Sequence, residues 1–452
     1  MRNRKIKASN GEFQLPEPII HHIQSFLTPK EAAQTAILSK YWRSAWLTRP
    51  NLDFPIPYRG KDKYLELAEK TIQRYEQSNL KIESLTLCIC NPRYGGVEYG
   101  APANDLITRA LKIGASRLSV RHYPEKMVLS QGLFESENLV ELSLDGCEID
   151  NLGFDSKVRC SKLESLSLSS VKISSEMISN IASCCPLIRK LLLYEVITFN
   201  NDSHRYNLGG LSSRFPSLKD LTLERCTTQE ISSRSIERLH LAAGHHSLSV
   251  KLDVPSVRKI RIEIESDEIS SLSFVSTPME CESDVSIKNF RSGLTTSWFL
   301  QLNKLLIELS VSTIYLSLNM FSSYSEKNCQ YEVGDIRGLP KPKLESLTLN
   351  MIPIGALEYF ALFHGLFQIC RPKFITANCR RSDGNNNLLC KTLSRGLDDD
   401  KYMYGLHDLE DVNVLFFDKD VDAWRPLPLK SFLDPSVSVG KQKVRFQLKW
   451  KP

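Results

Sequence analysis

The sequence predicts an α/β chain in which three short N-terminal helices precede a solenoid of repeats with a parallel β-sheet on its concave face. Two observations predict this architecture: apolar residues at helical spacing between residues 15 and 46, and a strand motif that recurs between residues 79 and 350. Repeats of this kind stack into one continuous core. A third observation, a change of pattern after residue 350, predicts a separate C-terminal cap.

The first predicted helix carries its apolar residues on one face. They follow the i, i+1, i+4, i+7, i+8 spacing of an amphipathic helix and are Ile19, Ile20, Ile23, Phe26 and Leu27.

The second and third helices have clear boundaries. Thr28 is a good N-cap, Pro29 suits the first helical position, and Glu31 completes a capping box. The expected buried side of the second helix is Ala32, Ala33, Ala36 and Ile37. The third helix has Leu38, Trp42, Ala45 and Trp46 on one face and ends before Pro50.

These three helices have more apolar surface than they can bury among themselves. Units of fewer than about 40 residues rarely fold alone without disulfides, metal or association, and this segment contains no cysteine. Each large apolar side chain gains roughly 1.5–3 kcal/mol from full burial. The surplus therefore predicts a partner that covers it.

The residues of this segment also resemble a known module, the F-box. The resemblance rests on Leu15-Pro16, the Ile-Ile-x-x-Ile helix, Ser25-Phe26-Leu27 and the run from Leu38 to Arg43. It is similar in particular to the version found in plant F-box proteins with leucine-rich repeats, as far as Phe54. Pro18 departs from the acidic residues that more commonly begin the first helix of an F-box, but the first turn of a helix tolerates proline.

The resemblance implies a docking site for a Skp-family adaptor, which joins F-box proteins to a cullin scaffold in a ubiquitin ligase. The alternative is an ordinary three-helix bundle folded onto the rest of the chain. The residues implied for adaptor binding are Leu15, Pro16, Ile20, Ile23, Phe26, Leu27, Ala33, Leu38, Trp42 and Trp46.

The repeated motif is an apolar residue, two polar residues and then Leu-x-Leu. Its central residues are Leu85, Leu142, Leu166, Leu191, Leu221, Leu239, Ile260 and Leu347. The better-formed units are about 24 residues apart, in the range of leucine-rich repeats. In a short strand both leucines point inward and the residue between them points to the opposite surface. The motif therefore predicts a parallel sheet whose concave face carries the mostly polar residues that lie between the leucines.

The connections between these strands are expected to vary. A helix is expected over Glu176 to Ala182, ending at Cys184-Cys185-Pro186, a junction that resembles the cysteine-containing class of leucine-rich repeats. Shorter spacings around Leu239 and Ile260 predict nearly all-strand units. Further strands are expected at Ile269 to Phe274 and Thr313 to Leu318, with a degraded repeat between Thr277 and Ser297.

The expected domains are a disordered basic tail (1–12), an F-box (13–55), a linker helix (56–78), leucine-rich repeats (79–350) and a capping region (351–452). The linker helix has Leu65, Ala68, Ile72 and Tyr75 on one stripe. The cap contains a helix from Leu357 to Ile369, closed by Arg371-Pro372, and strands at 409–414 and 444–450. Loops are expected at 382–387 and 398–400. This end resembles the FBD-like tail of the same plant proteins.

The composition argues against nucleic-acid binding, a membrane-spanning segment and secretion. A net charge of +6 from 58 basic and 52 acidic residues is too mild to indicate nucleic-acid binding. No apolar run is long enough to span a membrane and the basic start lacks a secretory core, so we expect an intracellular protein, in the nucleus or cytoplasm. The 12 cysteines are then expected to be reduced and mostly buried.

No catalytic or metal motif is recognisable. His364, Cys370, Cys379 and Cys390 have spacings that fit no standard zinc motif. No phosphate-binding glycine loop or nucleophile elbow is present. The sequence therefore predicts a non-catalytic protein without a cofactor.

The concave strand face of the predicted sheet is the expected site for a target protein. Leu192 and Tyr194 could form an apolar anchor or pack under an overhanging loop at 198–214. Arg258, Lys259 and Arg261 could attract an anion or form a solvated strand edge. The residues assigned to target binding are Thr86, Asp145, Ser167, Leu192, Tyr194, Thr222, His240 and Arg261.

Two functions are compatible with these patterns. The first is a substrate receptor of a cullin-based, SCF-type ubiquitin ligase, which acts by proximity and needs no chemistry of its own. The second is a repeat scaffold, unconnected to a ligase, whose N-terminal helices only cap the solenoid.

Overall fold

The structure is a computed structural model. It describes residues 15–55, 63–90, 100–123, 127–149, 158–197, 214–226, 228–244, 249–266, 268–288, 294–320, 333–336, 338–351, 356–379, 389, 393, 406–418, 421–427 and 444–451. The chain divides into two compact units, which we describe separately. The first comprises Met1–Leu166 with Ser170–Ile173, and the second comprises Ser167–Ser169 with Ser174–Pro452.

The first unit begins with the helices that the sequence predicts. The Thr28 side chain accepts a hydrogen bond from the Glu31 N–H, and the Glu31 carboxylate accepts one from the Thr28 N–H, at 3.3 and 3.0 Å. The predicted capping box is thus present. The helical elements are α1 (Glu17–Ser25), α2 (Pro29–Gln34), the 3₁₀ turn η1 (Thr35–Ile37) and α3 (Lys40–Thr48).

A parallel sheet follows directly from α3. Its strands, in spatial order, are β1 (Asn51–Phe54), β2 (Ser84–Cys90), β3 (Arg117–Tyr123) and β5 (Glu141–Asp145). Residues 51–54, the last part of the segment that resembles an F-box, form β1, in which Leu52 and Phe54 are buried and pair with β2. Strand β3 was missed because its motif ends in valine (Leu118-x-Val120) rather than leucine.

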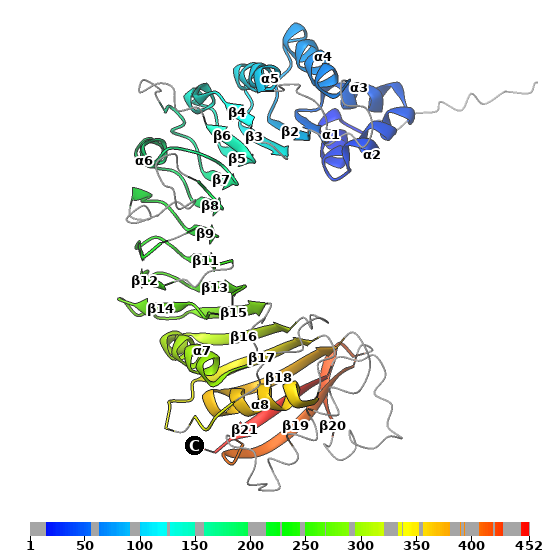
Figure 1. Cartoon of the computed structure of the whole chain (residues 1–452). Helices are drawn as coiled ribbons and strands as arrows, with labels where there is room; N and C mark the ends of the chain where they lie inside the picture. The colour runs from blue at the N-terminus through cyan, green and yellow to red at the C-terminus, as the bar shows by residue number, and fades with distance from the viewer. Residues whose placement is uncertain are drawn as a thin grey trace, which may run out of the picture. The chain divides into compact units, whose positions relative to one another are not determined.

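Helices cover one side of this sheet in the first unit (Figure 1). Helix α4 (Lys63–Gln77) buries Ala68, Ile72 and Tyr75, as its stripe predicts, and leaves Leu65 half-buried. Arg109 joins it to α5 (Gly100–Ile113) through ion pairs with Glu69 and Glu76 at 2.5 and 2.6 Å. A small second sheet pairs β4 (Met127–Leu129) with β6 (Cys147–Ile149), and η2 (Gln131–Glu135) lies between them in sequence.

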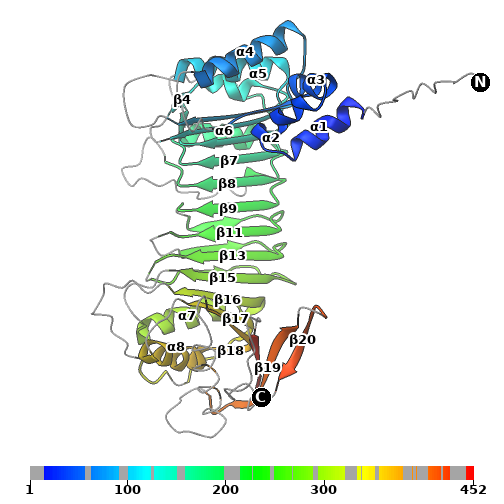
Figure 2. The ribbon, with the colours of Figure 1, turned by 90° about the vertical axis from the view of Figure 1, so that its right-hand side faces the viewer.

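The second unit contains a longer parallel sheet (Figure 2). Strand β7 (Ser165–Ser169) falls at the boundary between the units. The strands that follow, in spatial order, are β8 (Lys190–Tyr194), β9 (Asp220–Glu224), β11 (Arg238–Ala242), β13 (Lys259–Ile264), β15 (Glu282–Lys288), β16 (Thr313–Met320), β17 (Lys343–Met351) and β18 (Arg371–Cys379).

Burial alternates along these strands as the Leu-x-Leu motif requires. In β8, for example, Leu191 and Leu193 are buried while Leu192 and Tyr194 are half-buried. One face of the sheet therefore supplies the core. We call the opposite face, which contains Thr222 and His240, the open face. The predicted concave curvature of this face stays a prediction.

The connections on the core side are helical at both ends and strand-like in the middle of this unit. The middle consists of the sheet β10 (Glu230–Ser232), β12 (Ser249–Asp253) and β14 (Ser271–Phe274), so the shortened units are nearly all-strand, as predicted. The strand expected at 269–274 lies in this second sheet, not in the Leu-x-Leu sheet. The degraded repeat supplies β15. The helices are α6 (Ser175–Cys184) and α7 (Thr296–Glu308), and a 3₁₀ turn (Leu309–Val311) follows α7.

The C-terminal region closes the sheet with antiparallel strands. Strand β18 pairs with β21 (Val444–Trp450), which pairs with β19 (Leu409–Asp418), which pairs with β20 (Ala423–Leu427). The last parallel strand is therefore covered, as a solenoid end requires. Helix α8 (Ala356–Ile369) ends before Arg371-Pro372, as predicted, and these two residues begin β18, a strand that the repeat motif does not predict. The loops predicted at 382–387 and 398–400 lie outside the described residues, and the predicted domain boundaries stay predictions.

Glycine is required where α7 and α8 pack together. A Cβ atom built on Gly365 of α8 would lie 2.2 Å from the Phe299 ring of α7. We therefore expect Gly365→Ala to lower the free energy of unfolding by about 1–3 kcal/mol, the usual cost of overpacking a core. Chemical denaturation of the full chain measures this change. Gly100→Ala is the control, because its Cβ would have no neighbour closer than 3.9 Å, and equal stability of the two variants would contradict the packing.

Candidate protein-binding sites

The helices α1 to α3 leave large apolar side chains uncovered in the described structure. Ile37 is 87% exposed, Phe26 76%, Leu38 63% and Ile19 46%. Leaving such side chains in water forgoes the free energy of their burial, and contiguous exposed apolar side chains mark interaction surfaces. We call these four residues the helical apolar surface.

The residues predicted to bind an adaptor divide into three groups. Ile20 is fully buried, so its assignment is wrong: it packs inside the helices and cannot touch a partner. Pro16, Phe26 and Leu38 are exposed. The half-buried ones, which combine packing with an accessible edge, are Leu15, Ile23, Leu27, Ala33, Trp42 and Trp46.

The prediction that Ile37 lies on the buried side of the second helix is wrong, because its side chain is exposed. The chain changes from α-helix to a 3₁₀ turn at Thr35–Ile37. A 3₁₀ turn has three residues per turn, so side chains rotate away from the α-helical stripe. The helical period could not reveal this change, which turns Ile37 and Leu38 outward together.

Polar contacts hold these helices in place. His21 in α1 makes a 2.9 Å hydrogen bond to the Ala45 carbonyl of α3. The Arg49 guanidinium lies 3.2 Å from the centre of the Trp46 ring, and the Tyr75 hydroxyl donates a 2.5 Å hydrogen bond to the Arg49 carbonyl. Burial lowers the pKa of Arg49 to about 10, with Tyr75 acting in the opposite direction. These contacts therefore hold α1 and α3, which support the helical apolar surface, in a defined position within the first unit.

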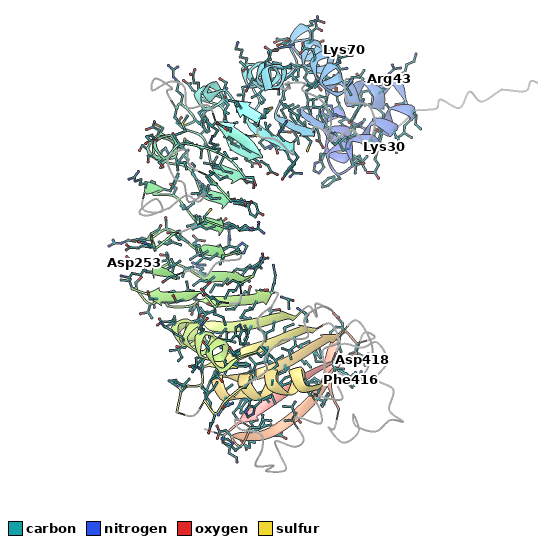
Figure 3. The ribbon with its side chains drawn as sticks, viewed as in Figure 1. Lys30, Arg43, Lys70, Asp253, Phe416 and Asp418 are labelled. Carbon is teal, nitrogen blue, oxygen red and sulfur yellow. The ribbon has the colours of Figure 1, made fainter. Side chains whose placement is uncertain are left out.

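The helices that carry the helical apolar surface also have exposed cations. Lys30, Lys40 and Arg43 are exposed, and none has an ion-pair partner among the described residues. Figure 3 labels Lys30 and Arg43 on the helices of the first unit. Electrostatic complementarity selects partners and speeds association. The surface therefore suits a partner that combines apolar and acidic residues.

The open face of the first unit contains two of the predicted target-binding residues. Thr86 in β2 is half-buried and pairs in register with Ser119 of β3. Asp145 in β5 accepts a 2.8 Å hydrogen bond from the Tyr123 hydroxyl and lies 3.2 Å from Arg121. Asp145 is thus already compensated. Ser167, a third predicted residue, is half-buried in β7 at the boundary of the units.

The remaining predicted residues lie in the second unit. Leu192, Thr222, His240 and Arg261 stand in register across β8, β9, β11 and β13, and the same row continues to Asp284. Tyr194 is in the next row, with the Arg225 guanidinium 5.6 Å from its ring centre. Of the loop at 198–214 that could overhang Leu192, residues 198–213 lie outside the described residues. Strand register therefore places these side chains on one face, as the motif predicts.

Charges on this face are largely paired. His240 has nitrogens 3.7 Å from Glu224 and 3.5 Å from Glu263, and Lys288 pairs with both Glu263 and Glu265. Burial alone would raise the pKa of Glu263, but the hydrogen bond and charge of Lys288 hold it below its usual value.

Two of the three cations of the possible anion site at 258–261 are also compensated. Lys259 lies 3.1 Å from Asp284 and 3.9 Å from Glu282, and Arg261 lies 3.9 Å from Asp284. The interpretation as a charged strand edge fits this geometry better than an anion site.

The cysteines mostly behave as buried thiols. Of the described cysteines, Cys147, Cys160, Cys185, Cys226, Cys281 and Cys370 are buried, Cys88 is half-buried and Cys184 is exposed. Burial raises the pKa of the Cys370 thiol to about 12. In the described part of the chain no three His, Cys, Asp or Glu residues are placed to hold a metal ion. None of its described helices is both long and apolar enough to cross a bilayer.

Comparison with known proteins identifies the repeats. A family model described as FBD-associated F-box protein At5g56370, LRR repeats, matches residues 111–290. The FBD-associated F-box protein At4g10400 of Arabidopsis thaliana is 27% identical over 57% of this chain. The F-box/LRR-repeat protein At3g59200 of the same plant is 26% identical over 75% of this chain and 68% of its own length. The resemblance to plant F-box/LRR-repeat proteins is confirmed.

The F-box/LRR match has defined limits. The alignment with At4g10400 spans 62% of that protein's length. The matched repeat region begins in α5 and ends just after β15, so it includes strand β3 and the irregular middle repeats. The family description and the names of these F-box/LRR relatives mention no catalytic activity.

We predict that Lys288→Met lowers the free energy of unfolding at neutral pH by about 0.5 kcal/mol, because partly exposed ion pairs contribute little. The pKa of Glu263 is held below its ordinary value of 4.5, so its contribution is present above that pH and is lost as the pH falls through the lowered value. The pKa of Lys288 is raised above its ordinary 10.5. Its contribution is therefore lost only at more alkaline pH.

Denaturant titrations of wild type and Lys288→Met between neutral and acidic pH measure this difference. Lys251→Met is the control, because Lys251 is exposed and has no ion pair among the described residues. A Lys288→Met effect that stays constant down to the lowest pH would contradict the assignment.

Proposed function

We propose that this chain is the substrate-recognition subunit of a cullin-based ubiquitin ligase. Helices α1 to α3 would dock a Skp-family adaptor, and the open face would hold a target protein. The observation that carries the proposal is the helical apolar surface, which lies in the segment that resembles an F-box. The names of the relatives support the same family of functions.

The two proposed binding roles follow from the chemistry of the helical apolar surface and of the open face. The helical apolar surface offers Phe26, Ile37 and Leu38 with unpaired cations nearby, which suits an acidic adaptor with an apolar groove. The open face offers half-buried polar side chains from successive strands. A receptor of this kind needs no catalytic group, because holding a target near a charged conjugating enzyme raises the effective concentration of its lysines.

The alternative function is a non-ligase interaction scaffold whose N-terminal helices cap the repeats. Contacts from α4 to the end of α3 make these helices part of the first unit: Arg74 donates a 3.1 Å hydrogen bond to the Leu47 carbonyl. Deleting residues 1–55 cannot separate the two functions, because it also removes buried Leu52 and Phe54 of β1. A test must leave the packing intact.

We therefore predict that Ile37→Asp combined with Leu38→Asp weakens capture of this chain by a purified Skp-family adaptor. Burial of one large apolar side chain is worth roughly 1.5–3 kcal/mol, so affinity should fall by about tenfold or more. Both side chains are exposed in the free chain, so the melting temperature should not change. Capture and thermal unfolding are measured on the full chain.

Val275→Asp combined with Met279→Asp is the matched control. These positions are 67% and 97% exposed but lie in the second unit, so this variant should bind the adaptor like wild type. Undiminished capture of the Ile37→Asp, Leu38→Asp variant would contradict the proposed docking site. No capture of the wild type would favour the scaffold function.

A further inference from the structure

An arginine near the end of the open face is held between aromatic rings. Arg445 is the second residue of β21, between the buried residues Val444 and Phe446, so its side chain lies on the open face. Its partners in register are Thr376 of β18 and Leu415 of β19. It therefore continues the row that includes Thr348 of β17.

Two rings support the Arg445 guanidinium, and they belong to strands on either side of β21. Its central carbon lies 4.2 Å from the centre of the Phe374 ring of β18 and 4.4 Å from that of the Trp424 ring of β20. Trp424 in turn packs edge-on against Phe417, with centroids 5.4 Å apart. A guanidinium stacks on rings through its flat faces. The contacts restrain the side chain and leave its N–H edge to donate.

No described residue makes a hydrogen bond or an ion pair with the Arg445 side chain. Its Nε atom is buried without an acceptor, which costs free energy. Its two terminal nitrogens are not among the buried atoms that lack a partner, so they are the ones that an incoming group could reach. Burial lowers the pKa of Arg445, and Glu345 acts weakly in the opposite direction. Glu345 itself is engaged at 2.8 Å by Lys373.

Other cations on this face differ in that respect. Lys259 and Arg261 have Asp284, and Lys288 has Glu263 and Glu265. A restrained, partly desolvated guanidinium without a counter-charge is therefore a local exception. Its planar fork matches the two oxygens of a carboxylate.

We propose that Arg445, supported by Phe374 and Trp424, binds a carboxylate of the protein that occupies the open face. The inference rests on the proposed function, since it assigns a chemistry to the target. A single uncompensated positive charge fits a carboxylate better than a phosphate dianion, which is normally held by several cations or backbone N–H groups. The carboxylate belongs either to an acidic side chain or to a chain terminus.

The aromatic rings also provide a reporter for this binding. The chain has 5 tryptophans, and labelling them with fluorotryptophan gives a small set of ¹⁹F resonances. Trp424→Phe identifies the Trp424 resonance. Three capped peptides serve as probes: acetyl-Gly-Glu-Gly-amide, acetyl-Gly-Gln-Gly with a free carboxyl terminus, and acetyl-Gly-Gln-Gly-amide. Inorganic phosphate is the fourth probe.

We expect the Trp424 resonance of the full chain to shift saturably with one of the two carboxylate peptides. The amide peptide should have no effect, and phosphate should bind more weakly. Dissociation constants should be about millimolar, as expected for about 4 kcal/mol of binding. The carboxylate peptide that shifts the resonance identifies the source, an acidic side chain or a terminus.

Arg445→Gln should weaken this binding by about tenfold or more, because a charge-assisted bidentate hydrogen bond is lost. Arg425→Gln is the matched control. Arg425 is the residue after Trp424 in β20, but it is already paired at 3.0 Å with Asp418, which Figure 3 labels. Arg445→Lys keeps the charge without the planar fork, so it should bind more weakly than wild type and remain folded even if Arg445→Gln does not.

Two results would overturn the proposal: no Trp424 shift with either carboxylate peptide, or an equal shift in wild type and in folded Arg445 variants. Phosphate binding as strong as that of the carboxylate peptides would overturn the carboxylate assignment. Adaptor capture tests α1 to α3 and uses no peptide. Failure of the carboxylate test therefore leaves the docking proposal unaffected, and failure of adaptor capture leaves the Trp424 measurement valid.

Discussion

The alternation of burial along each Leu-x-Leu strand determines most of this structure. Because side chains of a strand point alternately to its two faces, the two leucines of a motif enter the core and the residue between them reaches the open face. One repeat alone cannot bury its leucines, so neighbouring repeats must stack in parallel register. That register in turn aligns Leu192, Thr222, His240 and Arg261 in one row.

The periodic spacing of apolar residues and the helix-capping residues made much of the fold predictable. The capping box at Thr28, the stripe of α4 and the Leu-x-Leu strands are local patterns, and the structure has each of them. Long-range pairing was not predictable in the same way. Strand β3 lacks the second leucine, and β18 has a proline as its second residue, a residue that usually signals the end of an element.

The candidate sites show the same limit. The amphipathic pattern indicated an apolar surplus at the N-terminus, but it did not indicate which side chains are exposed. The side chain of Ile37, which lies in a 3₁₀ turn, is exposed to solvent, and that of Ile20 is fully buried. Arg445 gave no signal at all, because Phe374 and Trp424 meet it only through strand pairing. Exposed apolar side chains and an uncompensated guanidinium are properties of the tertiary structure.

We propose that the helical apolar surface binds a Skp-family adaptor. Hydrogen–deuterium exchange of the full chain, with and without a purified Skp-family adaptor, tests it most directly. The account predicts added protection confined to residues 15–48, together with unchanged exchange in the strands of the second unit. Unchanged exchange in those helices at saturating adaptor, or protection only in the repeats, would contradict it.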